Sequence, residues 1–220
     1  MIITPTRDFE CALHSNGVRW VIGCDEVGRG ALAGPVAVGM VVVDAEIEEM
    51  PPGLRDSKLL SEPRREALAP LCRAWARFSA VGLASAQEVD AVGIIACLGL
   101  AGNRALTALH EQGVPIQDAT VILDGNYDYL GSSLHSPARS SAGPAVVTQI
   151  KADQTCASVA AASVIAKVHR DRLMIERDTL TPGYGWAGNK GYGSAAHLAA
   201  IATLGASDFH RRTWLKQATA

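Results

Sequence analysis

Four acidic side chains in this chain come after apolar segments, at points where strands would end. They are Asp25, Glu26, Asp124 and Asp153. If they met, each pair of negative charges would repel by ~4 kcal/mol at 4 Å and an effective dielectric of 20. Divalent cations would neutralise such a cluster, and oxygen-only ligands suit Mg²⁺ or Mn²⁺ rather than zinc. Two such ions can activate a water molecule and stabilise the leaving oxygen of a phosphodiester.

A glycine-rich turn, Gly28-Arg29-Gly30, follows the first two carboxylates. Because glycine has no Cβ, the backbone of this turn can approach a ligand closely. A dinucleotide-binding loop is a weaker interpretation, since that motif opens a helix and here a valine-rich strand follows. Taken singly, Asp124 is explained by a plain turn and Asp153 by a helix N-cap. Their joint occurrence after three apolar segments favours a metal site that faces a phosphodiester.

The segments that must position these residues predict an α/β fold. Strands are expected at 20–24, 34–44, 78–84, 119–123 and 145–150, the first two forming a hairpin. Helices are expected at 61–76, 85–91, 94–112, 154–177 and 194–204, with a last short helix from about 207. Ser61, Ser85 and Ser194 are the expected N-caps. Strand ends at one edge of an α/β sheet can converge, which would gather the acids.

Residues 127–144 are rich in Gly, Ser and Pro and lack periodicity, which predicts a surface loop or flexible insertion. We divide the chain into a core, residues 1–177, that contains this insertion, and a C-terminal helical extension. The extension, residues 178–220, is not expected to fold independently.

Composition limits the classes of protein to consider. The chain has 220 residues, 48% of them hydrophobic, which is enough for one well-packed domain. Five cysteines without CxxC spacing argue against a disulfide framework or a zinc site. With no signal-peptide core and no apolar run long enough to span a bilayer, we expect a cytoplasmic protein. Residues 151–220 carry 9 Lys and Arg against 5 Asp and Glu, a modest basic bias that could hold a polyanion.

Several motifs together resemble the bacterial ribonuclease HII family, the type 2 ribonucleases H. The resemblance covers the chain from about residue 19 to 212, and its blocks occur in family order. The blocks are Cys24–Val36, Asp56-Ser57-Lys58-Leu59, Leu123-Asp124-Gly125-Asn126, Lys151-Ala152-Asp153 with the segment Ala160–Asp171, Asn189–Gly193 and His210-Arg211.

The resemblance implies a ribonuclease H-like mixed five-stranded sheet flanked by helices, with a small C-terminal helical extension. It implies a metal-dependent endonuclease that hydrolyses the RNA strand of RNA–DNA hybrids. It also implies incision 5′ to single ribonucleotides in duplex DNA, leaving 5′-phosphates. The expected partners are therefore these nucleic acids, with no membrane and no obligate protein partner, and the protein is expected to act as a monomer.

Site roles follow from the same resemblance. The four acids would be the catalytic ligands of two Mg²⁺ or Mn²⁺ ions. Gly28-Arg29-Gly30 would recognise the 2′-hydroxyl at an RNA–DNA junction, largely through backbone groups. Tyr192 would stack on the next deoxyribose, while Lys58 and Lys190 are candidates for phosphate contacts. The role of His210 is left open.

The sequence departs from the family pattern in small ways. Ala31 replaces a usual proline, Ala152 replaces a usual glycine, and the interval between Asp124 and Asp153 is long. Two rival functions are a catalytically silent hybrid-binding protein and another nuclease of the same fold, such as a transposase or junction resolvase. The intact acids argue against the first, and the glycine turn with Tyr192 argues against the second.

Overall fold

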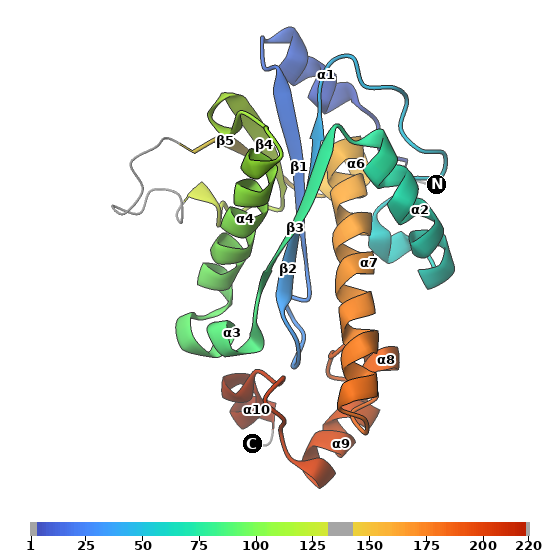
Figure 1. The fold of residues 1–220 in the computed structure, drawn as a ribbon, viewed down its shortest axis with the longest axis vertical. Coiled ribbons are helices and arrows are strands. Elements are labelled where there is room, and N and C mark those ends of the chain that lie inside the picture. The colour runs from blue at the N-terminus through green and yellow to red at the C-terminus, as the bar shows by residue number, and fades with distance from the viewer. Residues whose placement is uncertain (1–3, 132–142, 219–220) are drawn as a thin grey trace.

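Strand β1, Trp20–Val27, lies at the centre of a five-stranded mixed sheet in the computed structural model, which describes residues 4–131 and 143–218 (Figure 1). The strand order is β3-β2-β1-β4-β5. β1 is antiparallel to β2 and parallel to β4, β2 is antiparallel to β3, and β4 is parallel to β5. The bounds of the other strands are Val36–Val43 for β2, Phe78–Ala84 for β3, Ala119–Asp124 for β4 and Ala145–Gln149 for β5. The expected mixed sheet and the hairpin of the first two strands are confirmed.

Helices cover both faces of this sheet. In Figure 1, α4 lies over one face, and α7 with α2 lies over the other. The helices are α1 Asp8–Ser15, α2 Glu62–Trp75, α3 Ala86–Val92, α4 Ile94–Glu111, α6 Ala152–Thr155, α7 Ala157–Leu180, α8 Trp186–Asn189, α9 Ala195–Leu204 and α10 Arg212–Ala218. Short 3₁₀ turns are formed by Ser57–Leu59 and Ile116–Asp118. None of the helices described is long and apolar enough to cross a bilayer.

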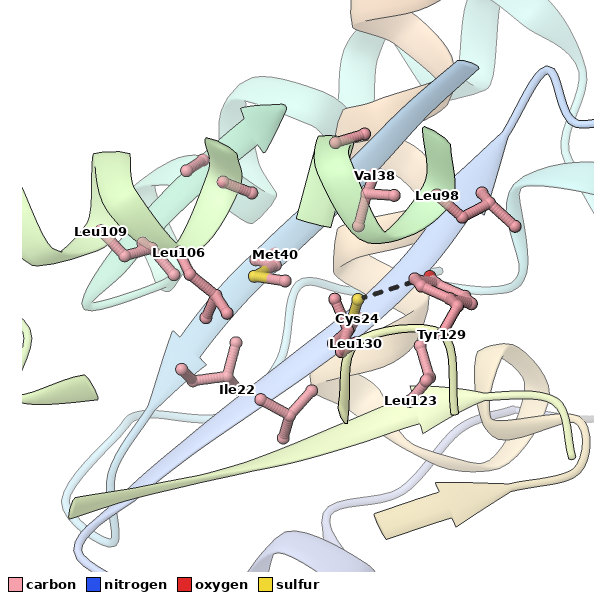
Figure 2. Close-up of a cluster of buried hydrophobic side chains, with 14 of the residues drawn as sticks. Ile22, Cys24, Val38, Met40, Leu98, Leu106, Leu109, Leu123, Tyr129 and Leu130 are labelled. Atoms are coloured by element: carbon pink, nitrogen blue, oxygen red, sulfur yellow. Dashed lines mark hydrogen bonds between the residues drawn. The ribbon is translucent and has the colours of Figure 1, made fainter. Parts of the chain in front are cut away.

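The two-sided cover explains why β2 is apolar at every position. Its alternate residues Val38 and Met40 pack toward α4, where Figure 2 shows them with Leu98 and Leu106. The intervening Val41 and Val43 belong to the second cluster, under α7 and α2. A strand buried on both faces needs a continuous apolar run rather than an alternating one.

Small residues allow α7 to lie directly against the central strands. A Cβ added to Gly23 of β1 would come within 2.3 Å of the backbone of Ser158. At Gly39 of β2, an added Cβ would lie 2.6 Å from the carbonyl oxygen of Ala162. The alanine-rich start of α7 therefore packs closely against the strand that carries Asp25 and Glu26.

Two element boundaries differ from the sequence-based expectation in ways that affect the acids. Strand β1 does not end at Cys24, because Asp25 and Glu26 continue its pairing with β2, opposite Gly39 and Val38. The helix expected over 154–177 is interrupted at Cys156, whose backbone is extended. Asp153 therefore lies in the separate short helix α6.

Other differences lie away from the sheet edge. Helix α1 and the single turn α8 were not expected, and the last helix begins at Arg212 rather than near 207. The expectation of a surface loop from residue 127 is wrong at Tyr129 and Leu130, which are buried (Figure 2). The Tyr129 hydroxyl lies 3.8 Å from the Cys24 sulfur. The rest of that expectation falls largely on residues 132–142, which lie outside the described residues.

Candidate active site

Strand order brings the four acids to neighbouring elements. β1 and β4 are adjacent and parallel, and Cys24 pairs with Leu123, so Asp25 and Asp124 are the next residues on neighbouring strands. β5 lies beside β4, and α6 with Asp153 follows it after two residues. The Asp124 carboxylate accepts hydrogen bonds from the amides of Ala152 at 2.7 Å and Asp153 at 3.5 Å. This contact fixes the start of α6 against the end of β4.

Burial and mutual repulsion both act on the carboxylates. Asp25 is only 3% exposed and accepts a 2.8 Å hydrogen bond from the amide of Glu26. Burial raises the pKa of Asp25 well above its usual value, and the charge of Glu26 raises it further. The pKa of Glu26 is also raised, first by burial and then by the charge of Asp124, although Arg29 opposes this. For Asp124, burial and the charge of Asp153 raise the pKa.

Lys58 supplies a positive charge inside this group. Its 3₁₀ turn is fixed by Asp56, whose carboxylate accepts a 2.9 Å hydrogen bond from the Lys58 amide. The Lys58 ammonium lies 2.9 Å from Asp153 Oδ2. Burial lowers the pKa of Lys58, but the charge of Asp25 and the contact with Asp153 raise it by more. Lys58 therefore pairs with an acid of the cluster, whereas the sequence suggested a phosphate contact.

The donor set has the chemistry of a hard-cation site, although its side chains are not gathered around one point. Within the described residues, no three Asp, Glu, His or Cys side chains are arranged to hold a metal ion. The four acids offer only carboxylate oxygens, which suit Mg²⁺ or Mn²⁺. Burial, together with mutual repulsion, raises the pKa values of Asp25, Glu26 and Asp124 although Lys58 and Arg29 oppose this. A cation fits this electrostatic field.

The glycine turn follows β1 directly. Gly28 has a φ of +82°, and a Cβ there would lie 2.1 Å from the Arg170 guanidinium, so only glycine fits. Nothing lies within 4 Å of the Cβ position of Gly30, so this side of the turn is open. Arg29 points back to Glu26, with 3.5 Å between Nη1 and Oε1. The structure thus places the turn next to the carboxylates, as expected.

Two buried arginines hold the loop that begins with this turn, and sequence reasoning gave neither of them a role. Arg170 donates hydrogen bonds to the carbonyl oxygens of Pro35, Lys190 and Ala33, at 2.8, 2.9 and 3.1 Å. Arg211 donates to the carbonyl oxygens of Gly28, Arg29 and Gly34, at both ends of the same loop. Both side chains are fully buried. Both arginines lie within the family motifs, and this was the only sequence signal of a role. The carbonyl oxygens that accept their hydrogen bonds are mostly distant in sequence.

Tyr192 lies beside the same arginine. Its ring centroid is 5.5 Å from the Arg170 guanidinium carbon and 5.7 Å from Lys167 Nζ, and the residue is half-buried. The preceding Gly191 carbonyl accepts hydrogen bonds from the amides of Leu32 and Ala33. The segment that carries Tyr192 is therefore joined to the glycine-turn loop.

Lys190 does not extend into open space. It is 7% exposed, its φ is +52°, and its ammonium contacts the Ala187 carbonyl and lies 3.5 Å from Glu62. Its own carbonyl accepts the hydrogen bond from Arg170. In this conformation Lys190 anchors the loop, so the structure does not present it as a phosphate ligand.

Within the C-terminal extension, a buried histidine pair contacts the backbone of Tyr192. Trp186 donates to His197 Nε2 at 3.0 Å, so His197 Nδ1 carries the proton and donates to the Tyr192 carbonyl at 2.8 Å. The Ser207 amide donates to His210 Nδ1, so His210 Nε2 carries the proton and, at 3.1 Å, shares the single lone pair of His197 Nε2 with Trp186. Both rings are neutral in this arrangement. The sequence had left the role of His210 open.

Comparison with known proteins identifies the family of this chain. The family model for ribonuclease HII matches residues 22–217. A ribonuclease HII from Streptomyces avermitilis is 45% identical over 96% of this chain and 83% of its own length. The crystal structure of ribonuclease H2 from Pyrococcus horikoshii aligns with a TM-score of 0.67 at 26% identity, covering 89% of this chain and 93% of that one.

A further solved structure, Bst-RNase HIII in complex with Mn²⁺, aligns with a TM-score of 0.65 at 25% identity over 88% of this chain and 65% of that one. The match of the family model and the high identity to the curated relative both extend over most of the chain. The chain therefore belongs to the ribonuclease HII family and is a ribonuclease H hydrolase.

Proposed function

We propose that this protein is a metal-dependent endonuclease that cleaves the RNA strand of RNA–DNA hybrids and incises 5′ to single ribonucleotides in duplex DNA. One observation carries the proposal: four carboxylates lie on three neighbouring elements, and a glycine turn with an open side follows the strand that carries two of them. The acids provide the chemistry, and the turn provides a means of recognising ribose.

Asp25, Glu26, Asp124 and Asp153 are the proposed ligands for Mg²⁺ or Mn²⁺. The bound ions would supply an activated water and stabilise the leaving oxygen. The solved Mn²⁺ complex of the structurally similar Bst-RNase HIII supports the proposal of a divalent metal. The Lys58 ammonium partly neutralises the acids through its ion pair with Asp153. A bound cation would neutralise them instead and would leave the ammonium free for the phosphate contact expected from the sequence.

We assign recognition of the RNA–DNA junction in the substrate to two segments of the chain. The turn Gly28-Arg29-Gly30 can donate backbone hydrogen bonds to a 2′-hydroxyl, the group that distinguishes RNA from DNA. The ring of Tyr192 can pack on the deoxyribose of the next nucleotide, where an added hydroxyl would crowd the contact. A phosphate contact by Lys190 would require its ammonium to leave Glu62. We therefore propose that Lys190 anchors its loop rather than binds phosphate.

The substrate duplex is the only partner that this function requires, and a monomer carries every residue assigned to it. The division into a core of residues 1–177 and an extension of residues 178–220 stays a prediction. Within that division, the extension supplies Tyr192 and Arg211, so it would act as the part that binds substrate.

The proposal is tested with end-labelled duplex DNA that contains one ribonucleotide, an all-DNA duplex of the same sequence, and an RNA–DNA hybrid. Each is incubated with Mg²⁺, with Mn²⁺ or with EDTA. We expect the ribonucleotide duplex and the hybrid to be cut only with a metal, and the all-DNA duplex to stay intact. Asp124→Asn is the matched inactive control. Cleavage in EDTA, or equal cleavage of the all-DNA duplex, would contradict the proposal.

A further inference from the structure

The loop from Gly28 to Pro35 turns a series of carbonyl oxygens toward the protein interior. Arg211 donates Nη2 to the Gly28 carbonyl at 2.7 Å and Nη1 to the Arg29 carbonyl at 2.8 Å. It also contacts the Gly34 carbonyl, from Nε at 3.2 Å and from Nη2 at 3.1 Å. One side chain therefore fixes both ends of the loop.

These contacts determine where two backbone amides point. In a planar trans peptide the C=O and the following N–H point in opposite directions, and the described residues contain no cis peptide bond. Because the Gly28 and Arg29 carbonyls point at Arg211, the amides of Arg29 and Gly30 must point away from it. Neither amide has a backbone or side-chain acceptor within the described part of the chain.

The environment of Arg211 distinguishes this arrangement from a simple ion pair. Its guanidinium is fully buried, and its hydrogen-bond acceptors in the described structure are carbonyl oxygens rather than carboxylates. Burial, followed by the nearby charge of Arg170, lowers the pKa of Arg211 to about 10, so it stays charged at neutral pH. A buried charge is costly unless its donors are satisfied, and here the loop carbonyls satisfy them.

We infer that Arg211 is a positioning residue that aims the amides of Arg29 and Gly30 at the 2′-hydroxyl of the substrate. This inference rests on the proposed function and deepens it. The donors of arginine lie on three nitrogens of one rigid plane, so Nε, Nη1 and Nη2 reach carbonyls at separate places in the loop. Lysine at this position keeps the charge but has a single nitrogen, so the two peptide planes would no longer be held.

The test measures binding rather than cleavage. Fluorescence anisotropy in EDTA gives the affinities of the full chain for the single-ribonucleotide duplex and for the all-DNA duplex. We expect Arg211→Lys to reduce the preference for the ribonucleotide duplex about tenfold, the loss of roughly 1.4 kcal/mol in hydrogen bonding. Binding to the all-DNA duplex should change less than about twofold. Arg212→Lys is the matched control. It is the same substitution at the next residue, whose side chain is exposed and does not contact the loop from Gly28 to Pro35.

Different failures lead to different conclusions. A purely structural role would lower the Tm of Arg211→Lys and weaken binding to both duplexes equally, which would overturn the inference. A retained preference in the folded variant would also overturn it and leave the proposed function intact. A wild-type protein with no preference would overturn both.

If Arg211→Lys does not fold, amide NMR of the ¹⁵N-labelled wild-type protein provides the second measurement. The Arg29 and Gly30 resonances should shift with the ribonucleotide duplex and not with the all-DNA duplex. Unshifted resonances would refute the orientation.

Discussion

Asp25→Asn is expected to stabilise the metal-free protein while it abolishes cleavage. The substitution keeps the size of the side chain and the oxygen that accepts from the Glu26 amide. It removes the cost of burying a charge, the repulsion by Glu26 and Asp124, and the attraction by Lys58. Each such pair is worth ~4 kcal/mol at 4 Å and an effective dielectric of 20. Two repulsions are removed for one attraction. After a discount for the partly exposed partners, the free energy of unfolding should rise by about 2 kcal/mol.

The gain is measured by thermal unfolding in EDTA, where about 2 kcal/mol corresponds to a rise of roughly 4–8 °C in Tm for a chain of this size. Mn²⁺ should then raise the Tm of the wild type but not that of the variant. Asp44→Asn, which neutralises a carboxylate paired with Arg77 away from the cluster, is the control and should change the Tm little. A lower metal-free Tm for Asp25→Asn, or cleavage near the wild-type rate, would refute this account of the acids.

Three further predictions concern other parts of the molecule. Burial, followed by the charge of His197, lowers the pKa of His210 to about 4. The unfolded chain therefore binds more protons below pH ~6.5, so the free energy of unfolding should fall by on the order of 3 kcal/mol toward pH 4. In urea titrations, His210→Gln should show a smaller loss, and an equal loss would count against the histidine pair. Tyr129→Ala should lower the free energy of unfolding by ~3 kcal/mol or more by leaving a cavity, whereas Tyr129→Phe should cost far less; equal losses would contradict core packing. Tyr192→Ala should strongly reduce cleavage of the single-ribonucleotide duplex and Tyr192→Phe should retain most of it, while a loss that merely follows the Tm would indicate a packing role.

The sheet could be predicted from the sequence because its signals are local. Valine-rich runs and turn residues identified all five strands. The N-cap expected at Ser85 was confirmed, and reciprocal hydrogen bonds with Glu88 complete a capping box there. The end of β1 could not be predicted, since two adjacent carboxylates rarely continue a buried strand. Here the pairing partner opposite Asp25 is Gly39, and that contact is invisible in a local pattern.

In the candidate site, too, features with a local sequence signal could be predicted, and those that depend on distant contacts could not. The acids and the glycine turn were found by motif, but the roles of Lys58 and Lys190 depend on contacts that span 95 and 128 residues of sequence. Arg211 was missed for a similar reason, because its acceptors are backbone carbonyls that any sequence would provide. Burial of Tyr129 was hidden by the Gly- and Ser-rich composition around it.

The most direct test of the central claim is to map the cut in duplex DNA that carries one ribonucleotide. If the acids hold cations that activate water, and the glycine turn only recognises the 2′-hydroxyl, the proposed function predicts a break on the 5′ side of the ribonucleotide. The products would then carry a 3′-hydroxyl and a 5′-phosphate. A break on the 3′ side that leaves a 2′,3′-cyclic phosphate would show that the 2′-hydroxyl is the nucleophile, and would contradict the account.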